Sequence, residues 1–213
     1  MRVALVSLNQ CWQDKDANFS RCADFARTAS SHNCELVIFP EMTLTGYSLA
    51  MDNAAEPEFG STTLEQFGEL ARETRLAIVF GACLFNPATH RPRNQLCLAH
   101  ADGTSQAIYA KIHPFSFAGE DKVLEAGGRL GTFSVGALRL GASICYDLRF
   151  PEMYAAMAPV CSAAIAIANW PARRIAHWRS LLVARAIENQ FFMLGVNRIG
   201  IDGNQLAYEK STM

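Results

Sequence analysis

The chain has 213 residues, of which 50% are hydrophobic, and 19 basic and 20 acidic residues give a formal net charge of −1. This length is enough for one substantial core, so we predict a single domain over residues 1–213. The balanced charge gives no electrostatic basis for binding nucleic acid or an anionic membrane, and no apolar run is long enough to cross a bilayer. A cytoplasmic location is therefore the default expectation.

Strands and helices alternate at both ends of the chain, and the middle is rich in strands. Apolar runs predict strands at residues 3–8, 36–39, 77–85, 94–100, 105–110, 133–135, 138–144, 163–168 and 191–197. Helical spacing predicts helices at residues 17–31 (capped by Asp16), 62–74, 150–157 and 175–190, while residues 48–61 are expected to form a loop. Because the strands are almost continuously apolar, sheets covered on both faces follow, in an α/β layered sandwich of mixed sheets.

The cysteines and histidines do not suggest a metal site. The seven cysteines contain no CxxC pair, and the five histidines show no metal-ligand spacing. We therefore expect neither a disulfide framework nor a metal, and no cofactor.

Cys145 is the strongest candidate for a nucleophile. It ends an apolar strand inside Gly-Ala-Ser-Ile-Cys-Tyr-Asp-Leu-Arg-Phe-Pro (residues 141–151), and a helical segment opens directly after it. A thiol at such a turn is presented at the rim of a sheet, beside free backbone N–H groups. A small buried core cysteine is the alternative interpretation.

Two other apolar strands also end on charged residues. Glu41 follows a strand and a proline, where partial desolvation can turn a carboxylate into a general base, although a solvated loop glutamate is the alternative. Lys111 ends the strand at 105–110, where its charge could lower the pKa of a thiol and stabilise an oxyanion. The alternative for Lys111 is an ordinary strand-edge lysine. His113 would permit a Cys–His dyad, but that arrangement leaves the lysine unexplained.

The motifs around Glu41, Lys111 and Cys145 together resemble those of the nitrilase (carbon–nitrogen hydrolase) superfamily, on its amidase branch. The segments at 168–171 (Ala-Asn-Trp-Pro), 177–178 and 184–190 further resemble the bacterial ω-amidases within that family. The resemblance implies a four-layer αββα sandwich of mixed β-sheets. It also implies that a Glu–Lys–Cys triad hydrolyses small linear amides through a cysteine thioester, releasing ammonia and a carboxylic acid.

The resemblance implies a role for each triad residue. Glu41 would take the proton of Cys145, while Lys111 and the Tyr146 backbone N–H would hold the oxyanion. Relatives carry a second glutamate shortly after the lysine, and Glu120 matches it, with Asp121 and Glu125 as competing alignments.

The residues after the strand at 163–168 are the candidates for substrate binding. Asn169 lies on the rim where the site forms, and Trp170 could line the pocket or pack as an ordinary aromatic residue. Arg174 could bind a substrate carboxylate, or it could be a solvated arginine at a helix start. Arg149 is expected to pair with a nearby carboxylate in a structural role, and the face from Arg185 to Glu188 is expected to form an internal ion pair.

The resemblance leaves the substrate and the assembly open. An ω-amidase acting on 2-oxo-acid amides is the first hypothesis, and an amidase or N-carbamoyl hydrolase for another small amide, such as deaminated glutathione, is the second. Relatives continue beyond residue 213 with further strands, so the last strands of the fold are expected to be missing, and a non-catalytic binding subunit is a third hypothesis. A homodimer is expected, through the helix after Cys145 and the helix at 175–190. Met153, Tyr154 and Met157 could serve that interface or the core.

Overall fold

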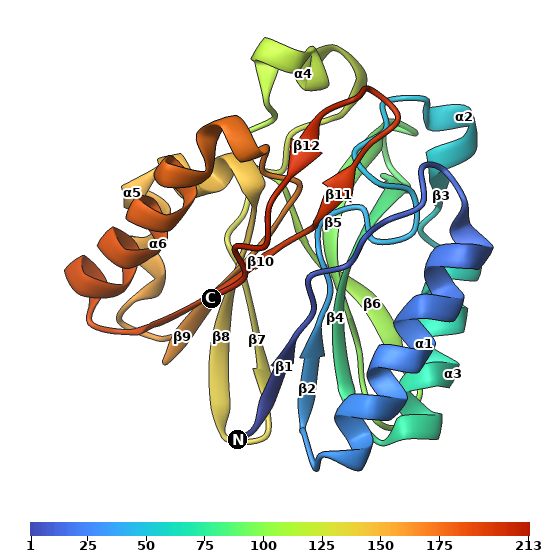
Figure 1. Ribbon diagram of the computed structural model, residues 1–213, viewed down its shortest axis with the longest axis horizontal. Coiled ribbons are helices and arrows are strands. Elements are labelled where there is room, and N and C mark those ends of the chain that lie inside the picture. Colours follow the sequence, from blue (N-terminus) through green and yellow to red (C-terminus); the bar gives the residue numbers. More distant parts are fainter.

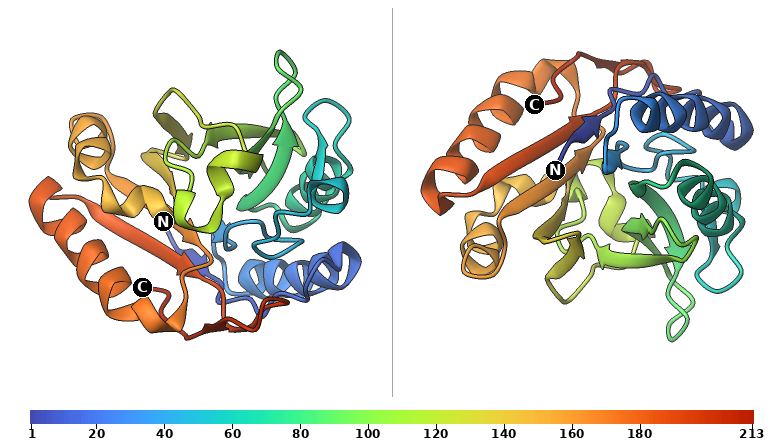
Figure 2. Two further views of the ribbon diagram at one scale, coloured as in Figure 1. Left: turned by 90° about the horizontal axis from the view of Figure 1, so that it is seen from above. Right: turned by 90° about the horizontal axis from the view of Figure 1, so that it is seen from below.

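The computed structural model describes all residues, 1–213, and contains two main β-sheets that lie face to face between two pairs of helices (Figure 1). Helices α1 and α3 cover the outer face of one sheet, and α5 and α6 cover the outer face of the other (Figure 2). The predicted four-layer αββα arrangement is therefore confirmed. The longest helix, α1, has 17 residues, and no helix combines the length and apolarity that crossing a bilayer requires.

The first sheet has the strand order β1-β2-β4-β5-β6, with β3 beside β4. Its strands are β1 (Val3–Leu5), β2 (Leu36–Ile38), β3 (Ala55–Pro57), β4 (Ala77–Phe85), β5 (Pro92–Ala99) and β6 (Ser105–Ala110). The helices on its outer face are α1 (Lys15–Ser31) and α3 (Thr62–Thr74), and a short helix, α2 (Met51–Ala54), precedes β3. β1, β2 and β4 run parallel, so their carboxyl ends meet at the upper edge in Figure 1.

The second sheet has the order β10-β9-β8-β7. Its strands are β7 (Gly131–Val135), β8 (Leu138–Ile144), β9 (Ala163–Ala168) and β10 (Phe192–Asn197). The helical segments of this half are α4 (Glu120–Val123), α5 (Pro151–Met157), α6 (Ile175–Asn189) and the 3₁₀ turns η1 (Ser116–Ala118), η2 (Cys145–Arg149) and η3 (Ala172–Arg174). A small hairpin of β11 (Gly200–Ile201) and β12 (Ala207–Tyr208) follows β10.

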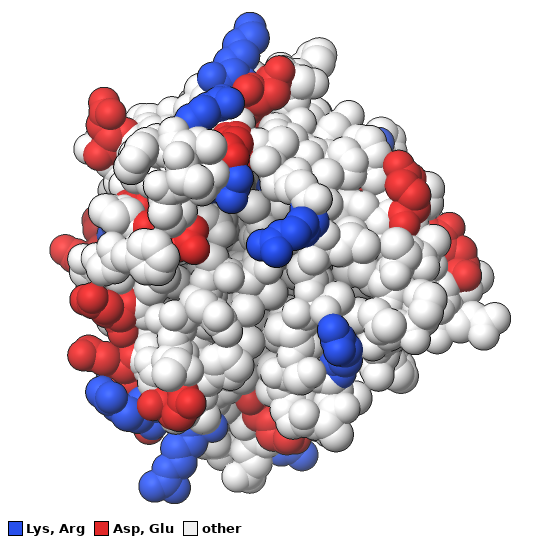
Figure 3. All heavy atoms as spheres, turned by 180° about the vertical axis from the view of Figure 1, so that it is seen from behind, with Lys and Arg blue, Asp and Glu red and all other residues white.

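Burial of apolar side chains explains these layers. A cluster of 20 buried residues joins α1 and α3 to the first sheet, and a cluster of 28 fills the space between the sheets and continues to α5 and α6. Met153, Tyr154 and Met157 belong to the second cluster, so of the two roles left open for them the core is correct. Charged side chains of both signs are scattered over the face seen from behind, with separate basic side chains near its middle, and no continuous basic patch appears on it (Figure 3).

Three local predictions were wrong. Asp14, not Asp16, caps α1, because the helix begins at Lys15 and the Asp14 carboxylate accepts the Ala17 N–H at 3.0 Å. Residues 48–61 contain α2 and β3 instead of a loop, since β3 pairs with the end of β4 and Glu56 accepts hydrogen bonds from the start of α3. The first strand ends at Leu5, after which the chain leaves the sheet.

Candidate active site

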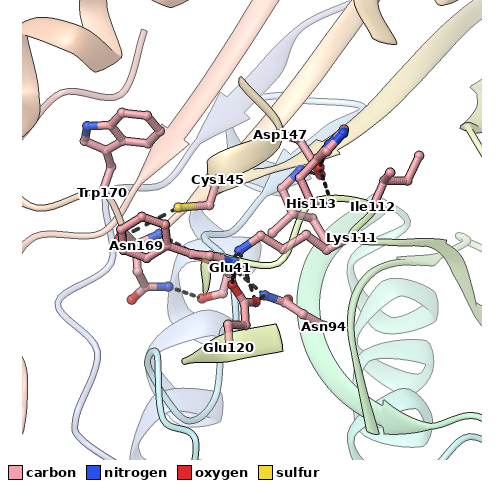
Figure 4. Close-up of polar contacts among 12 residues, drawn as sticks. Glu41, Asn94, Lys111, Ile112, His113, Glu120, Cys145, Asp147, Asn169 and Trp170 are labelled. Atoms are coloured by element: carbon pink, nitrogen blue, oxygen red, sulfur yellow. Dashed lines mark hydrogen bonds and ion pairs between the residues drawn. The ribbon is translucent and has the colours of Figure 1, made fainter. Parts of the chain in front are cut away.

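Glu41, Lys111 and Cys145 lie together at one end of the two sheets, although 70 and 34 residues separate them along the chain. Glu41 follows β2 by three residues, Lys111 follows β6 directly, and Cys145 follows β8 directly (Figure 4). The glutamate and the lysine are completely or almost completely buried, and the cysteine is half-buried.

Glu41 is held in place by backbone contacts on both sides. The loop that carries it crosses β4 at Gly81, where an added Cβ would lie 2.4 Å from the Met42 nitrogen, so only glycine allows this close approach. The amide nitrogen of Gln10 donates to the carbonyls of Glu41, Met42 and Thr43 at 2.8–3.1 Å. The carboxylate therefore has a defined direction before any substrate binds.

Lys111 lies between two carboxylates. Its Nζ is 3.1 Å from Glu41 Oε1, 3.1 Å from Glu120 Oε1 and 2.8 Å from Glu120 Oε2, which matches its three N–H donors with three contacts. Burial by itself would lower the pKa of Lys111, but Glu41 and Glu120 outweigh burial and hold that pKa well above its usual value. The lysine is therefore a permanent cation with its hydrogens already engaged.

The two carboxylates differ in the number of acceptor positions that remain free. An ionised carboxylate offers about four lone-pair positions, two on each oxygen. Those of Glu120 are all used: Oε1 accepts from Lys111 and from Asn94 (3.1 Å), and Oε2 accepts from Lys111 and from the Phe115 N–H (2.6 Å). Burial would raise the pKa of Glu120, but the lysine and these donors lower it.

Glu41 keeps one acceptor position. Its Oε1 accepts from Lys111 and, at 2.7 Å, from Asn94, whereas Oε2 accepts only the Asn169 N–H at 2.8 Å. One lone pair on Oε2 is thus free to receive a proton. Of the two carboxylates, only Glu41 retains this capacity.

Cys145 has the backbone geometry of a nucleophile elbow. Its φ of +49° lies in the left-handed region, which non-glycine residues rarely adopt. Burial and then Glu41 raise the pKa of the thiol well above its usual value, and the opposing effect of Lys111 is smaller. Lys111 lowers the thiol pKa as predicted, but burial and Glu41 outweigh it, so the resting cysteine is a protonated thiol that needs a base.

Asp147 fixes the elbow from behind. Its Oδ2 accepts the Ile144 N–H at 3.0 Å and the Tyr109 hydroxyl at 2.7 Å, and its Oδ1 lies 2.8 Å from His113 Nδ1. His113 also stacks on Phe150 with the ring centroids 3.5 Å apart. The histidine thus belongs to the support of the elbow, which argues against a Cys–His dyad.

A pocket of about 260 Å³ opens above Cys145. The four residues predicted to bind substrate all line it: Tyr146, Asn169, Trp170 and Arg174. Trp170 satisfies both of its alternatives, because it lines the pocket and also packs on Trp178 with centroids 5.5 Å apart. The Asn169 side chain is already engaged, since its Nδ2 donates to the Glu41 carbonyl at 2.7 Å.

The expected role of Arg149 was wrong. It makes no ion pair with a carboxylate, and its guanidinium lies over the Trp170 ring at 5.1 Å and 3.2 Å from His177 Nδ1, in the pocket wall. Arg174 lies over the Phe115 ring at 5.3 Å, and burial followed by its arginine neighbours lowers its pKa. The predicted Arg185–Glu188 ion pair is present at 2.9 Å.

Asp121 and Glu125, the alternative candidates for the second glutamate, make no contact with Lys111. Asp121 is exposed, and Glu125 binds Arg93, Asn86 and Thr89. Sequence analysis also missed Asn94 and Asp147, whose contacts hold the charged groups and the elbow. Nothing in the sequence distinguished Asn94 from its polar neighbours Arg93 and Gln95 at the start of β5.

Comparisons with known proteins agree on one family. Residues 2–213 match the family model described as carbon–nitrogen hydrolase. Omega-amidase YafV of Yersinia enterocolitica is 30% identical over 213 residues, which are 100% of this chain and 80% of that protein. The 2-oxoglutaramate amidase of Bacillus subtilis strain 168 is 32% identical over 179 residues, 84% of this chain and 69% of that protein.

Solved structures share the fold. XC1258 from Xanthomonas campestris, a CN-hydrolase superfamily protein with an arsenic adduct in its active site, has a TM-score of 0.90 at 32% identity, covering 98% of this chain and 79% of that chain. An amidase from Nesterenkonia sp. AN1 has a TM-score of 0.89 at 24% identity, covering 100% of this chain and 84% of that one.

Proposed function

The chain belongs to the carbon–nitrogen hydrolase family, and on that premise we propose that residues 1–213 form one domain that hydrolyses small amides carrying a carboxylate, with 2-oxo-acid ω-amides as the first substrates to test. The observation that supports this substrate class best is the charge of the pocket lining. Arg149, Arg173 and Arg174 line the pocket, no Asp or Glu does, and none of the three arginines has a carboxylate partner. A bound carboxylate would supply the missing partner.

The proposed mechanism gives each polar group one task. Glu41 takes the thiol proton on Oε2, and the Cys145 sulfur attacks the amide carbonyl carbon, forming a tetrahedral oxyanion. The charge of Lys111 and the Tyr146 N–H stabilise this oxyanion, because Tyr146 lies in the first turn of η2, where backbone N–H groups lack partners within the helix.

The second half of the reaction reuses the same base. The protonated Glu41 gives its proton to the leaving nitrogen, the C–N bond breaks, and ammonia departs to leave a thioester on Cys145. Glu41 then removes a proton from water as the water oxygen attacks the thioester; the C–S bond breaks, the carboxylic acid is released, and Glu41 returns the proton to the Cys145 sulfur. Glu120 has no free acceptor position and therefore acts by holding Lys111.

A panel of amides with ammonia detection tests the proposal. The panel contains 2-oxoglutaramate, a neutral amide of the same chain length, an N-carbamoyl amino acid and deaminated glutathione. We expect the fastest turnover with 2-oxoglutaramate. Turnover of the carbamoyl compound without turnover of 2-oxo-acid amides would contradict our first choice of substrate.

Arg174→Met should change substrate affinity more than chemistry. A charge-assisted hydrogen bond contributes about 1.5–3 kcal/mol, so KM for a carboxylate-bearing amide should rise about 10- to 150-fold while kcat changes little. The neutral amide should be hydrolysed as before. Arg179→Met on the exposed face of α6 is the matched control, because Arg179 does not line the pocket. An equal loss for both substrates would contradict the assignment.

The homodimer and the cytoplasmic location stay predictions. Of the two helices expected at the dimer interface, α5 and α6, the exposed apolar side chains favour α6. Val183 and Ile187 on α6 and Phe192 on β10 are 45%, 72% and 76% exposed, so α6 presents an apolar surface that a second copy would cover. Light scattering should report a dimer at micromolar concentration, and Ile187→Lys should weaken it. A monomeric wild-type protein would contradict this proposal.

A further inference from the structure

Asn94 contacts both carboxylates of the site and the backbone of Lys111 without lining the pocket. Its Nδ2 donates to Glu41 Oε1 at 2.7 Å and to Glu120 Oε1 at 3.1 Å, and its main-chain carbonyl accepts the main-chain N–H of Lys111 at 2.9 Å. It is 1% exposed and lies on β5, between the loop of Glu41 and helix α4. No substrate atom can reach it while these contacts persist.

The orientation of the Asn94 amide follows from its partners. Ionised carboxylates only accept hydrogen bonds, so the atom between Glu41 and Glu120 must be the nitrogen, which has two hydrogens to give. The amide oxygen is then left buried without a partner. An unpaired buried acceptor is unfavourable, and its presence indicates that this position requires the two N–H donors.

We propose that Asn94 is a positioning residue that directs the proton of Cys145 to one oxygen of Glu41. Its two N–H groups occupy acceptor positions on Glu41 Oε1 and Glu120 Oε1, which leaves Glu41 Oε2 as the only carboxylate oxygen with a free lone pair. The same side chain helps to hold the pKa of Glu120 low beside Lys111. This inference rests on the proposed role of Glu41 as the base.

Loss of the Asn94 donors should alter how the site titrates. The groups that face it are Glu41 after β2, Glu120 on α4 and Lys111 after β6, with Cys145 and the Tyr47 phenol close to them. Hydrogen bonds to an ionised carboxylate lower its pKa, and Asn94 is one of the groups that lower the pKa of Glu120. Without it, Glu120 binds a proton at higher pH, and the ionic contact by which Glu120 holds Lys111 beside Glu41 weakens below that pH.

Asn94→Leu tests the proposal, since leucine has a similar shape and no donor. We expect kcat to fall at least about 30-fold with KM changed less than about threefold, and the acid limb of the pH–kcat profile to move up by about one pH unit. Asn94→Asp, of nearly unchanged volume, should lose more activity at pH 8 than at pH 6, because an ionised third carboxylate repels the other two. If Asn94→Leu does not fold, Asn94→Asp tests the proposal in its place.

Asn86→Leu is the matched control. Asn86 is also buried and donates its Nδ2 to a glutamate, Glu125, at 3.0 Å, but outside the site. Its loss should lower stability without moving the pH profile. If Asn94→Leu folds and keeps the kcat and acid limb of the wild type, the proposal is overturned.

A second readout separates this proposal from the proposed function. The rate of Cys145 alkylation by iodoacetamide can be followed against pH without any amide turnover. Slower alkylation of Asn94→Leu with its profile moved to higher pH supports the assignment even if every amide in the panel fails. Identical alkylation profiles for wild type and variant contradict it, whatever the substrate is.

Discussion

Replacing Cys145 with alanine should lower amide hydrolysis at least about 10⁴-fold, because the sulfur is the only atom in the site placed to form the acyl intermediate. The fold should persist, since the half-buried thiol makes only a long contact, 4.0 Å, to the Asn169 carbonyl. Ammonia release measures the loss of activity, and thermal unfolding checks the fold.

Alkylation distinguishes the catalytic sulfur from the other thiols. Iodoacetamide should label Cys145 ahead of the six other cysteines, four of which are buried, and labelling should abolish turnover. Glu41→Gln should slow this labelling, because the resting thiol is protonated and a neutral amide is not basic enough to take its proton. If Cys145 reacts no faster than a free thiol in solution and no amide releases ammonia, the chain is a binding subunit with an inert site.

The triad candidates could be found in the sequence because each directly follows or closely follows an apolar strand. Parallel neighbours such as β2 and β4 end at the same edge of the sheet. A charged residue that follows one such strand therefore lies near the charged residues that follow the others. The hydrogen-bond partners of each group come from segments far apart in the sequence. Asn94 and Glu41 are 53 residues apart, and no local pattern records the hydrogen bond between them.

The net shift of the Cys145 pKa and the surroundings of Arg149 could not be predicted from the sequence, for a common physical reason. The pKa of Cys145 depends on the balance of burial, Glu41 and Lys111, and burial is set by side chains from several strands and loops. Arg149 was assigned a carboxylate partner because arginine usually has one, whereas aromatic faces and His177 surround it here. Both features depend on the surroundings of a residue and not on its position on an element.

Lys111→Met should impair stability and activity together. Methionine keeps most of the side-chain volume, but the carboxylates of Glu41 and Glu120 would then face each other in the core with no cation. Breaking a buried ion pair in this way costs about 3–5 kcal/mol, which urea unfolding at pH 7 should detect. Loss of one oxyanion-stabilising group should also lower kcat about 10²- to 10³-fold.

The pH dependence of the Lys111→Met effect has a definite sign. In the wild type the pKa of Glu120 is lowered, so its contribution to stability is present above the unfolded pKa of about 4.3 and is lost as the pH falls through the folded value. In the variant, one buried carboxylate has a raised pKa and is destabilising only when ionised. The stability difference should therefore shrink toward acid pH and grow toward neutral pH.

A double variant separates charge from packing. Adding Glu120→Gln to Lys111→Met removes one of the two opposed charges and should restore part of the lost stability, while activity stays low because the cation is still missing. Lys122→Met on the exposed side of α4 is the control and should change neither property. Equal stability of Lys111→Met and the wild type at pH 7 would mean that the two carboxylates do not depend on Lys111, and the ionic arrangement that supports Glu41 as the base would be contradicted.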